Sequence, residues 1–176
     1  MTESYLQIAA NNEELSRDIV ERASARGVTV STAESLTAGM IASTIADIPG
    51  ASAVFRGGAV TYCDEIKHRV LGVEQETLDR FSAVSHQTAR EMAAGSLDLY
   101  QSDIAVSATG YAGPGGGTEQ DPAGTFYIGW AYRAADGGAP VVESARCHYE
   151  GDRSCVRAYA VAEALERIVR VLNSME

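Results

Sequence analysis

Short apolar segments with strand character alternate with amphipathic segments of helical periodicity along most of the chain, and no other feature limits the fold as much. Apolar residues recur at i, i+4 in residues 12–26 and along 153–173, as on the buried face of a helix. Residues 103–108 are nearly all apolar, which is typical of a strand buried on both faces. The alternation predicts an α/β fold, a three-layer α/β/α sandwich around a mixed, mostly parallel sheet.

Caps and breakers place the remaining elements. Asn12 and Ser85 are suitable N-caps, and Gly57-Gly58 suggests a bulge or a close backbone approach within a strand. We expect a single domain over residues 1–176, with a loosely ordered segment at 1–11 and no repeats or linkers. Further strands are expected over 28–32, 53–62, 124–133 and 140–150, and the last two are joined by "AADGGA". Further helices are expected over 63–72, 75–81 and 86–100, and another that includes Met40 and Ile48 should end at Pro49.

Charge and composition restrict the partners. The net charge is −10, so no basic surface is large enough to neutralise several phosphates, and neither a nucleic acid nor an anionic membrane is favoured. A small molecule is the expected partner, and the sequence leaves open whether the chain forms a homo-oligomer. No segment resembles a signal peptide or a membrane-spanning helix, so we expect a cytoplasmic protein. Three scattered cysteines and three histidines lack metal-ligand spacing, so neither a metal nor a cofactor is expected.

The stretch "TVSTAESLTAGMIAS" (29–43) places four hydroxyl side chains and a carboxylate where a strand gives way to a helix. One hydroxyl is enough to cap a helix. Ser35 lies where helix N–H groups could stabilise a developing oxyanion, which makes it a candidate nucleophile, although it could also be a helix cap alone. Glu34 could support the site through hydrogen bonds or lie on the surface as an ordinary carboxylate.

A second unusual segment, "SATGYAGPGGGTEQDPAG" (107–124), follows the buried strand and contains six glycines. Glycine lets backbone N–H groups approach a bound anion, although the segment could also be a floppy connector. Ligands of open α/β sheets bind beyond the carboxyl ends of strands. Because the first stretch also leaves a strand, the two segments could share one crevice.

A serine nucleophile needs a base, and no histidine follows a strand in a suitable way. The signatures GxxxxGK[ST], GxGxxG before a helix, YxxxK and GxSxG are all absent. Lys67 could act as the base if burial lowers its pKa, with Tyr62 relaying a proton; alternatively they are a solvated lysine and an ordinary strand aromatic. Arg153 in the first turn of a helix could bind a phosphate or be a merely exposed arginine.

Four segments together resemble the CinA C-terminal family, the nicotinamide mononucleotide amidases also called NMN deamidases or PncC. They are "TAESLTAG" (32–39), "GGAVTYCDEIK" (57–67), "VSATGYAGPGGGTEQDPAGT" (106–125) and "GDRSCVR" (151–157). The resemblance covers nearly the whole chain, in order. It implies a single α/β/α domain that hydrolyses the carboxamide of nicotinamide mononucleotide to nicotinate mononucleotide and ammonia in pyridine-nucleotide recycling.

The resemblance also implies roles for individual residues. Ser35 would be the nucleophile, Lys67 its base and Tyr62 an accessory to the proton transfer. This chain has Thr109 and Tyr111 where the family often reads SGxAGP. These side chains line a loop that the resemblance places near the ring or ribose of the substrate. The expected substrate-binding residues are Glu34, Thr37, Thr109, Gly110, Ala112, Gly113 and Arg153, with Arg153 on the 5′-phosphate.

Two other functions remain open from the sequence. The chain could be a non-catalytic nucleotide-binding or regulatory module that keeps the fold and the pocket, because the presence of side chains does not prove their geometry. It could also be a serine hydrolase that acts on another small amide.

Overall fold

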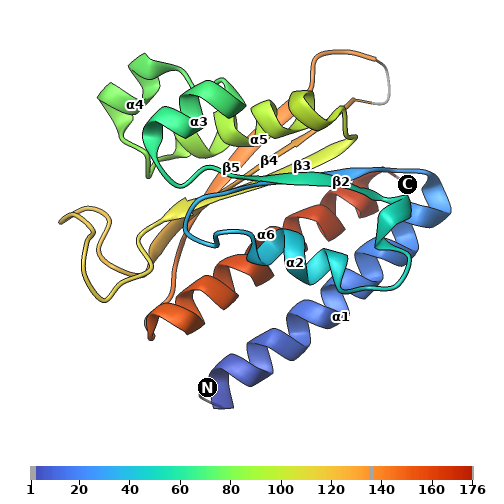
Figure 1. The fold of residues 1–176 in the computed structure, drawn as a ribbon, viewed down its shortest axis with the longest axis horizontal. Helices are drawn as coiled ribbons and strands as arrows, with labels where there is room; N and C mark the ends of the chain where they lie inside the picture. The colour runs from blue at the N-terminus through green and yellow to red at the C-terminus, as the bar shows by residue number, and fades with distance from the viewer. Residues whose placement is uncertain (1–2, 135–136, 176) are drawn as a thin grey trace.

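The chain folds into a five-stranded mixed sheet with helices on both faces, as Figure 1 shows. The structure, a computed structural model, describes residues 3–134 and 137–175. The expected three-layer α/β/α architecture is confirmed. In chain order the elements are α1 (Glu3–Arg26), β1 (Val30–Glu34), α2 (Met40–Ala46), a 3₁₀ turn (Ala51–Ala53), β2 (Phe55–Val60), α3 (Asp64–Leu71), α4 (Gln75–Phe81), α5 (His86–Tyr100), β3 (Ile104–Gly110), β4 (Thr125–Tyr132), β5 (Val141–His148) and α6 (Arg153–Ser174).

The strand order is β2-β1-β3-β4-β5. The strands β2, β1 and β3 are parallel, and β4 is antiparallel to both β3 and β5. The direction of β5 is therefore the same as that of β3. As a result, β1, β2, β3 and β5 all have their carboxyl ends at one edge of the sheet, and the segments that follow them meet there.

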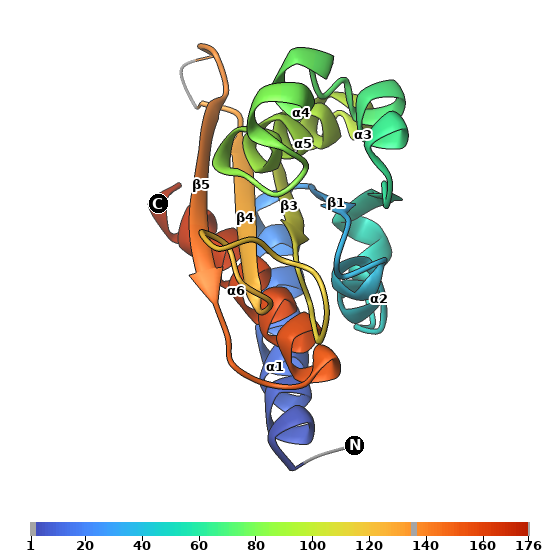
Figure 2. The ribbon, with the colours of Figure 1, turned by 90° about the vertical axis from the view of Figure 1, so that its left-hand side faces the viewer.

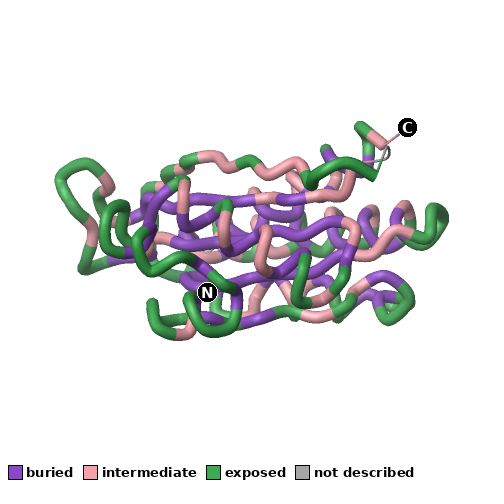
Figure 3. The backbone as a smooth tube through the Cα atoms, turned by 90° about the horizontal axis from the view of Figure 1, so that it is seen from above, coloured by how far each residue is buried: buried purple, intermediate pink, exposed green. Residues whose placement is uncertain are grey.

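Two helical layers enclose the sheet (Figures 1 and 2). Helices α1, α2 and α6 cover one face and bury the largest apolar cluster, whereas α3, α4 and α5 cover the other face over smaller clusters. Figure 3 shows that burial follows the strands, while exposed residues lie on the helices and in the connecting segments.

Strand β1 lies between β2 and β3 in the sheet, and every residue in it is buried. Its side chains alternate between the two layers, as a strand requires. Val30 packs in the cluster below α1, α2 and α6, whereas Ala33 packs in the cluster below α3 and α5. The strand runs two residues later than the expected 28–32, which places Glu34 at its end and Ser35 just beyond it.

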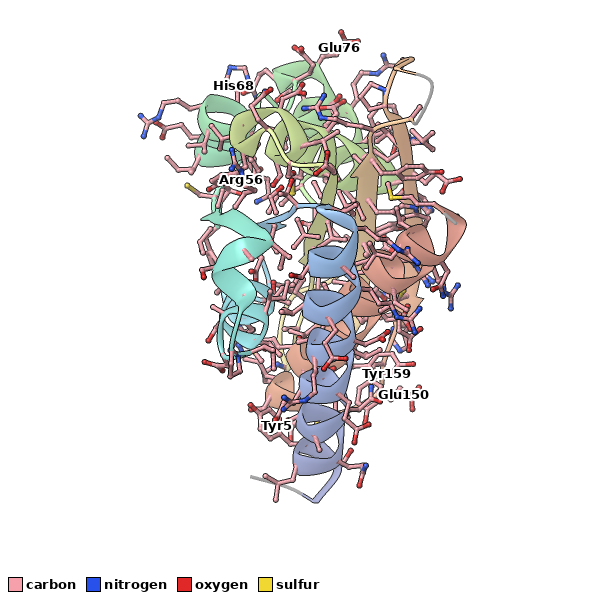
Figure 4. All side chains as sticks on the ribbon, turned by 90° about the vertical axis from the view of Figure 1, so that its right-hand side faces the viewer. Tyr5, Arg56, His68, Glu76, Glu150 and Tyr159 are labelled. Atoms are coloured by element: carbon pink, nitrogen blue, oxygen red, sulfur yellow. The ribbon has the colours of Figure 1, made fainter. Side chains whose placement is uncertain are left out.

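Helix α1 begins at Glu3, so the expectation of a loosely ordered segment over 1–11 is wrong for the described residues 3–11. Asn12 lies inside the helix and is not its N-cap. The Asn12 amide is buried and donates to the carbonyl of Ala158 in α6 at 2.9 Å. The hydroxyls of Ser4 and Tyr149 lie 3.2 Å apart. Figure 4 places Tyr5 and Tyr159 at this same end of the molecule. Contacts between α1 and the start of α6 therefore extend the helix, and sequence periodicity does not reveal them.

The remaining boundaries agree closely with the expectations. Helices α3, α4 and α5 lie where they were predicted, and Ser85 and Asp152 cap α5 and α6 with their side chains. Strands β4 and β5 pair as the predicted hairpin, although residues 135 and 136 of the joining "AADGGA" lie outside the described residues. The predicted strand over 53–62 is shorter, at Phe55–Val60.

The glycine pair in β2 has a structural reason. The pairing with β1 shifts between Val30 and Ser31, which leaves Arg56 as a bulge. A Cβ atom on Gly58 would collide with the hydroxyl of Thr32 and crowd the methyl of Ala42 in α2. Both expectations for this pair, a bulge and a close approach, are therefore confirmed.

Candidate active site

A cleft of about 240 Å³ opens at the edge of the sheet where β1, β2 and β3 end. Figure 2 looks toward this edge, with the loop after β3 and the start of α6 at the front. Five segments of the chain contribute to the walls. The lining residues are Ser35, Leu36, Tyr62, Asp64, Lys67, Ala83, Val84, Thr109, Gly110, Tyr111, Ala112, Gly115 and Arg153. The two strand-exit segments that the sequence singled out therefore share one crevice, as expected.

Ser35 is the first residue beyond β1. Its backbone N–H donates to the carbonyl of Ala108 in β3 at 2.8 Å, which fixes its position against the neighbouring strand. The side chain is buried but lines the cleft. Within residues 3–134 and 137–175, its hydroxyl makes no hydrogen bond, so it remains available to a bound molecule.

Glu34 precedes Ser35, and its side chain points to the face of the sheet that α2 covers, where it caps the start of that helix. Its carboxylate accepts hydrogen bonds from the N–H groups of Gly39, Ile41 and Ala42 at 2.9, 3.0 and 2.8 Å. The expectation that a hydroxyl caps this helix is wrong. Helix α2 begins only at Met40, and its N-cap residue is Gly39, which has no side chain to accept a hydrogen bond. Glu34 is 1% exposed and does not line the cleft. The expectations of a surface carboxylate and of a substrate contact are both wrong, because the helix uses its oxygens.

Lys67 is the only lysine in the sequence; the other 13 of the 14 basic side chains are arginines. It lies on the inner face of α3, one turn before the buried Leu71, and is 1% exposed. Its amine donates to the carbonyl of Tyr62 at 3.4 Å and pairs with the carboxylate of Asp64 at 3.6 Å. The alternative of a solvated lysine is therefore wrong.

Two opposing effects act on the Lys67 amine. Burial disfavours the charged form and lowers its pKa below the ordinary value, and this effect is the largest. The negative charge of Asp64, its hydrogen bond and a smaller contribution from Cys63 raise the pKa in the opposite direction. Because burial dominates, the neutral amine is more accessible near physiological pH than that of a surface lysine, which is what a base needs.

Tyr62 and Arg153 meet at the mouth of the cleft. Arg153 donates through Nη2 to the Tyr62 hydroxyl at 3.2 Å and through Nη1 to the Gly113 carbonyl at 3.0 Å. Both side chains are exposed. The arginine thus links the start of α6, the segment after β2 and the glycine-rich loop, and its remaining N–H groups are open to an anion.

The glycine-rich loop is anchored at both ends. Tyr111 donates to the Thr125 carbonyl at 2.9 Å, and its own carbonyl accepts from Gly124 at 2.7 Å. Further along, Asp121 pairs with Arg146 at 2.8 Å. These contacts argue against a floppy connector.

The expected substrate-binding residues divide into two groups. Thr109, Gly110 and Ala112 line the cleft together with Arg153. The Thr109 hydroxyl, however, donates to the Ala83 carbonyl at 2.6 Å, and a Cβ on Gly110 would collide with Phe126. Thr37 and Gly113 do not line the cleft: the Thr37 hydroxyl is fully buried, and Gly113 contributes its carbonyl to Arg153.

Sequence reasoning missed Arg157, which lies one turn after Arg153 in α6. Its Nε donates to the carbonyl of Leu36 at 2.9 Å and its Nη2 to that of Thr37 at 2.8 Å. These two bonds hold the turn that follows Ser35. The two arginines are four residues apart and therefore lie on one helix face. This spacing was the one feature of the sequence that could have indicated that Arg157 lies near the site.

Two backbone N–H groups stand out in the cleft that Ser35 lines. In the part of the chain that the structure describes, the N–H groups of Leu36 and Ala112 have no acceptor, although both residues are buried and line the cleft. Buried backbone donors are almost always paired. Unpaired donors that line the same cleft as a hydroxyl can bind a developing oxyanion.

Other site types have less support within the described residues. No group of three or more His, Cys, Asp and Glu side chains is placed to hold a metal ion there. None of the helices described has both the length and the apolar character to cross a bilayer.

Comparison with known proteins identifies relatives of the whole chain. The family model of the CinA C-terminal domain matches residues 12–172. The nicotinamide-nucleotide amidohydrolase PncC of Escherichia coli K12 is 42% identical over 168 residues, which cover 96% of this chain and 95% of that protein. A longer protein from Caldicellulosiruptor saccharolyticus is 43% identical over 89% of this chain, and the match spans only 36% of its length.

Solved structures share the fold. The competence/damage inducible protein CihA from Agrobacterium tumefaciens has a TM-score of 0.84 at 40% identity, covering 93% of this chain and 96% of that chain. A protein of the competence-damaged protein (CinA) superfamily from Klebsiella pneumoniae has a TM-score of 0.85 at 37% identity, covering 93% and 98%. The mixed sheet and its connections are thus those of the solved relatives.

Proposed function

Because this chain belongs to the CinA C-terminal domain family, we propose that it hydrolyses the carboxamide of nicotinamide mononucleotide to nicotinate mononucleotide and ammonia. The proposal rests above all on one observation. Ser35, whose hydroxyl makes no hydrogen bond within the described residues, lines the same cleft as Lys67, the only lysine of the sequence, and burial lowers the pKa of the lysine amine. The amidohydrolase name of the Escherichia coli relative, which matches almost end to end, supports the choice of substrate.

In the proposed mechanism the neutral Lys67 amine accepts the proton of the Ser35 hydroxyl as Ser35 Oγ attacks the carboxamide carbon. The carbonyl oxygen becomes an oxyanion, which accepts hydrogen bonds from the N–H groups of Leu36 and Ala112. The Lys67 ammonium then returns the proton to the departing amine, which leaves as ammonia. Water hydrolyses the resulting ester and regenerates Ser35.

Tyr62 and Arg153 serve the rest of the substrate in this proposal. Arg153 binds the 5′-phosphate with the N–H groups that its bonds to Tyr62 and Gly113 leave open. The positive charge matters because the chain carries a net charge of −10, which opposes the approach of an anionic nucleotide. The Tyr62 hydroxyl, held by Arg153 at the cleft mouth, is placed to assist proton transfer once substrate is bound.

The direct test is to incubate the purified protein with nicotinamide mononucleotide over a range of pH and to measure ammonia. We expect stoichiometric release of ammonia and nicotinate mononucleotide. Nicotinamide, nicotinamide riboside and other small amides serve as comparison substrates. Faster release from an amide without the phosphate would contradict the proposed substrate and favour a serine hydrolase of another small amide.

One observation favours a second candidate, a module that binds the nucleotide without turning it over. The Asp64 carboxylate lies 3.6 Å from the Lys67 amine and favours its inert, protonated form. In that case calorimetry would detect binding of nicotinamide mononucleotide, and no ammonia would be released at any pH.

Arg153→Ala is expected to raise KM about 10-fold to 100-fold with a smaller change in kcat, because a charge-assisted contact to the phosphate contributes mainly to binding. Steady-state kinetics on nicotinamide mononucleotide would measure the two constants. Arg170→Ala is the matched control, since Arg170 is exposed on the same helix and pairs only with Glu166 within the described residues. An unchanged KM in Arg153→Ala would contradict the phosphate assignment.

A further inference from the structure

Asp64 is a residue of the cleft that the proposed mechanism does not use. It lies in the first turn of α3, one turn before Lys67, and lines the cleft with it. Its carboxylate Oδ1 is 3.6 Å from the Lys67 amine, while the Asp64 side chain remains 57% exposed. An exposed carboxylate therefore faces an amine that is almost fully buried.

The other groups around the Lys67 amine are neutral in their ordinary states or engaged elsewhere. The Tyr62 carbonyl accepts a hydrogen bond from it, and the Cys63 thiol affects its pKa only weakly. Across the cleft Arg153 is occupied with Tyr62, and Ala83 and Val84 carry no charge. On the far side of β1, Glu34 is bonded to the start of α2. Asp64 is thus the dominant negative charge that acts on the amine.

We propose that Asp64 is a positioning residue for Lys67, which holds the amine at the cleft and stabilises the ammonium that forms when Ser35 gives up its proton. The proton moves from Ser35 Oγ to the lone pair of Lys67 Nζ, so a positive charge develops beside the Asp64 carboxylate. Attraction between them lowers the free energy of that state. The same attraction favours protonation of the resting amine, so Asp64 also sets the pH range in which Lys67 can act as a base. This inference rests on the proposed function only for its link to turnover.

The substitution Asp64→Asn removes the charge and keeps the shape. In the protein without substrate, the Lys67 amine then loses its proton at lower pH. Because Lys67 must be neutral to act as a base, the variant becomes active at lower pH than the parent. We expect the ratio of kcat/KM at about pH 6 to that at about pH 9 to rise about three- to fivefold, the range of a partly exposed ion pair. We also expect a lower activity at the alkaline plateau, because the ammonium formed in the reaction loses its partner.

The chain allows this titration to be observed without any enzymatic assay. Because Lys67 is the only lysine, protein grown with lysine labelled with carbon-13 at Cε gives one side-chain signal. Its chemical shift against pH reports the protonation of Lys67 directly. We expect the midpoint of this titration to be lower in Asp64→Asn than in the parent protein, and to be restored by Asp64→Glu.

Glu65→Gln is the matched control. Glu65 lies in the same helical turn, is 77% exposed, pairs with Arg69 and does not line the cleft. The substitution Glu65→Gln removes the same charge from the same helix end, so its unfolding curve should match that of Asp64→Asn. The midpoint of the Lys67 titration in Glu65→Gln should match that of the parent protein.

An unchanged midpoint in Asp64→Asn, or an equal change in Glu65→Gln, would overturn the role of Asp64. If the parent protein released no ammonia, the proposed function would fail, while the lysine titration would still decide the inference. If ammonia were released with the same pH profile in parent and Asp64→Asn, the inference would fail and the function would stand.

Discussion

Replacing Ser35 with alanine is expected to lower ammonia release from nicotinamide mononucleotide by at least about 1,000-fold, because the proposed acyl-enzyme ester forms on the Ser35 hydroxyl. The fold should remain intact, since the Ser35 side chain makes no hydrogen bond in the described part of the chain. Steady-state assays measure the loss, and calorimetry should still detect nucleotide binding.

The control for this substitution is Ser43→Ala. Ser43 is exposed in α2, on the same connection but away from the cleft. It loses the same hydroxyl and should keep full activity. Near-full activity in Ser35→Ala would show that Ser35 is not the nucleophile, and the proposed role of Lys67 as its base would fall with it.

Glu34→Ala is expected to give the largest loss of stability, about 3–5 kcal/mol in the free energy of unfolding. The substitution leaves the N–H groups of Gly39, Ile41 and Ala42 without their acceptor at a buried helix start. For a chain of this size the melting temperature should fall by roughly 10 °C. Denaturant unfolding followed by circular dichroism measures the free energy.

Two further variants test the cause of this loss. Glu34→Gln keeps one acceptor oxygen and turns an NH₂ group toward backbone donors, so it should also be destabilised. Glu76→Ala removes an exposed glutamate of α4, labelled in Figure 4, which pairs with Arg80, and should change stability by less than about 0.5 kcal/mol. If Glu34→Ala unfolded at the same denaturant concentration as Glu76→Ala, the capping role would be wrong.

Most of the fold could be predicted from periodicity and local signals. The buried strand around 103–108, the cap Ser85 and the glycines in β2 each have a cause within a few residues of sequence. The start of α1 could not be predicted in this way. It depends on contacts with Tyr149 and Ala158, which lie more than 140 residues away.

The site was predicted less completely, for a related reason. The strand was expected to end at residue 32, so Glu34 was placed in the connection that follows it. The alternation of side chains along β1, which turns Glu34 toward α2, was therefore not applied to it. Asp64 stands three residues before Lys67, a spacing that brings side chains together on a helix, but its importance depends on the burial of Lys67 below the cleft. The contact between Arg157 and the Leu36 carbonyl could be predicted only if the order of the strands in the sheet were known, because that order brings α6 next to the turn after β1.

Helices α1 and α6 run side by side in the same direction, and this has a practical consequence for protein engineering. The start of α1 lies next to Tyr149, close to the edge of the sheet that carries the cleft, whereas the last turn of α6 packs beside Arg26 at the far edge. A fluorescent protein or an affinity tag fused after α6 would therefore stand clear of arriving substrate. The same fusion ahead of α1 would emerge at the end of the molecule that carries the cleft.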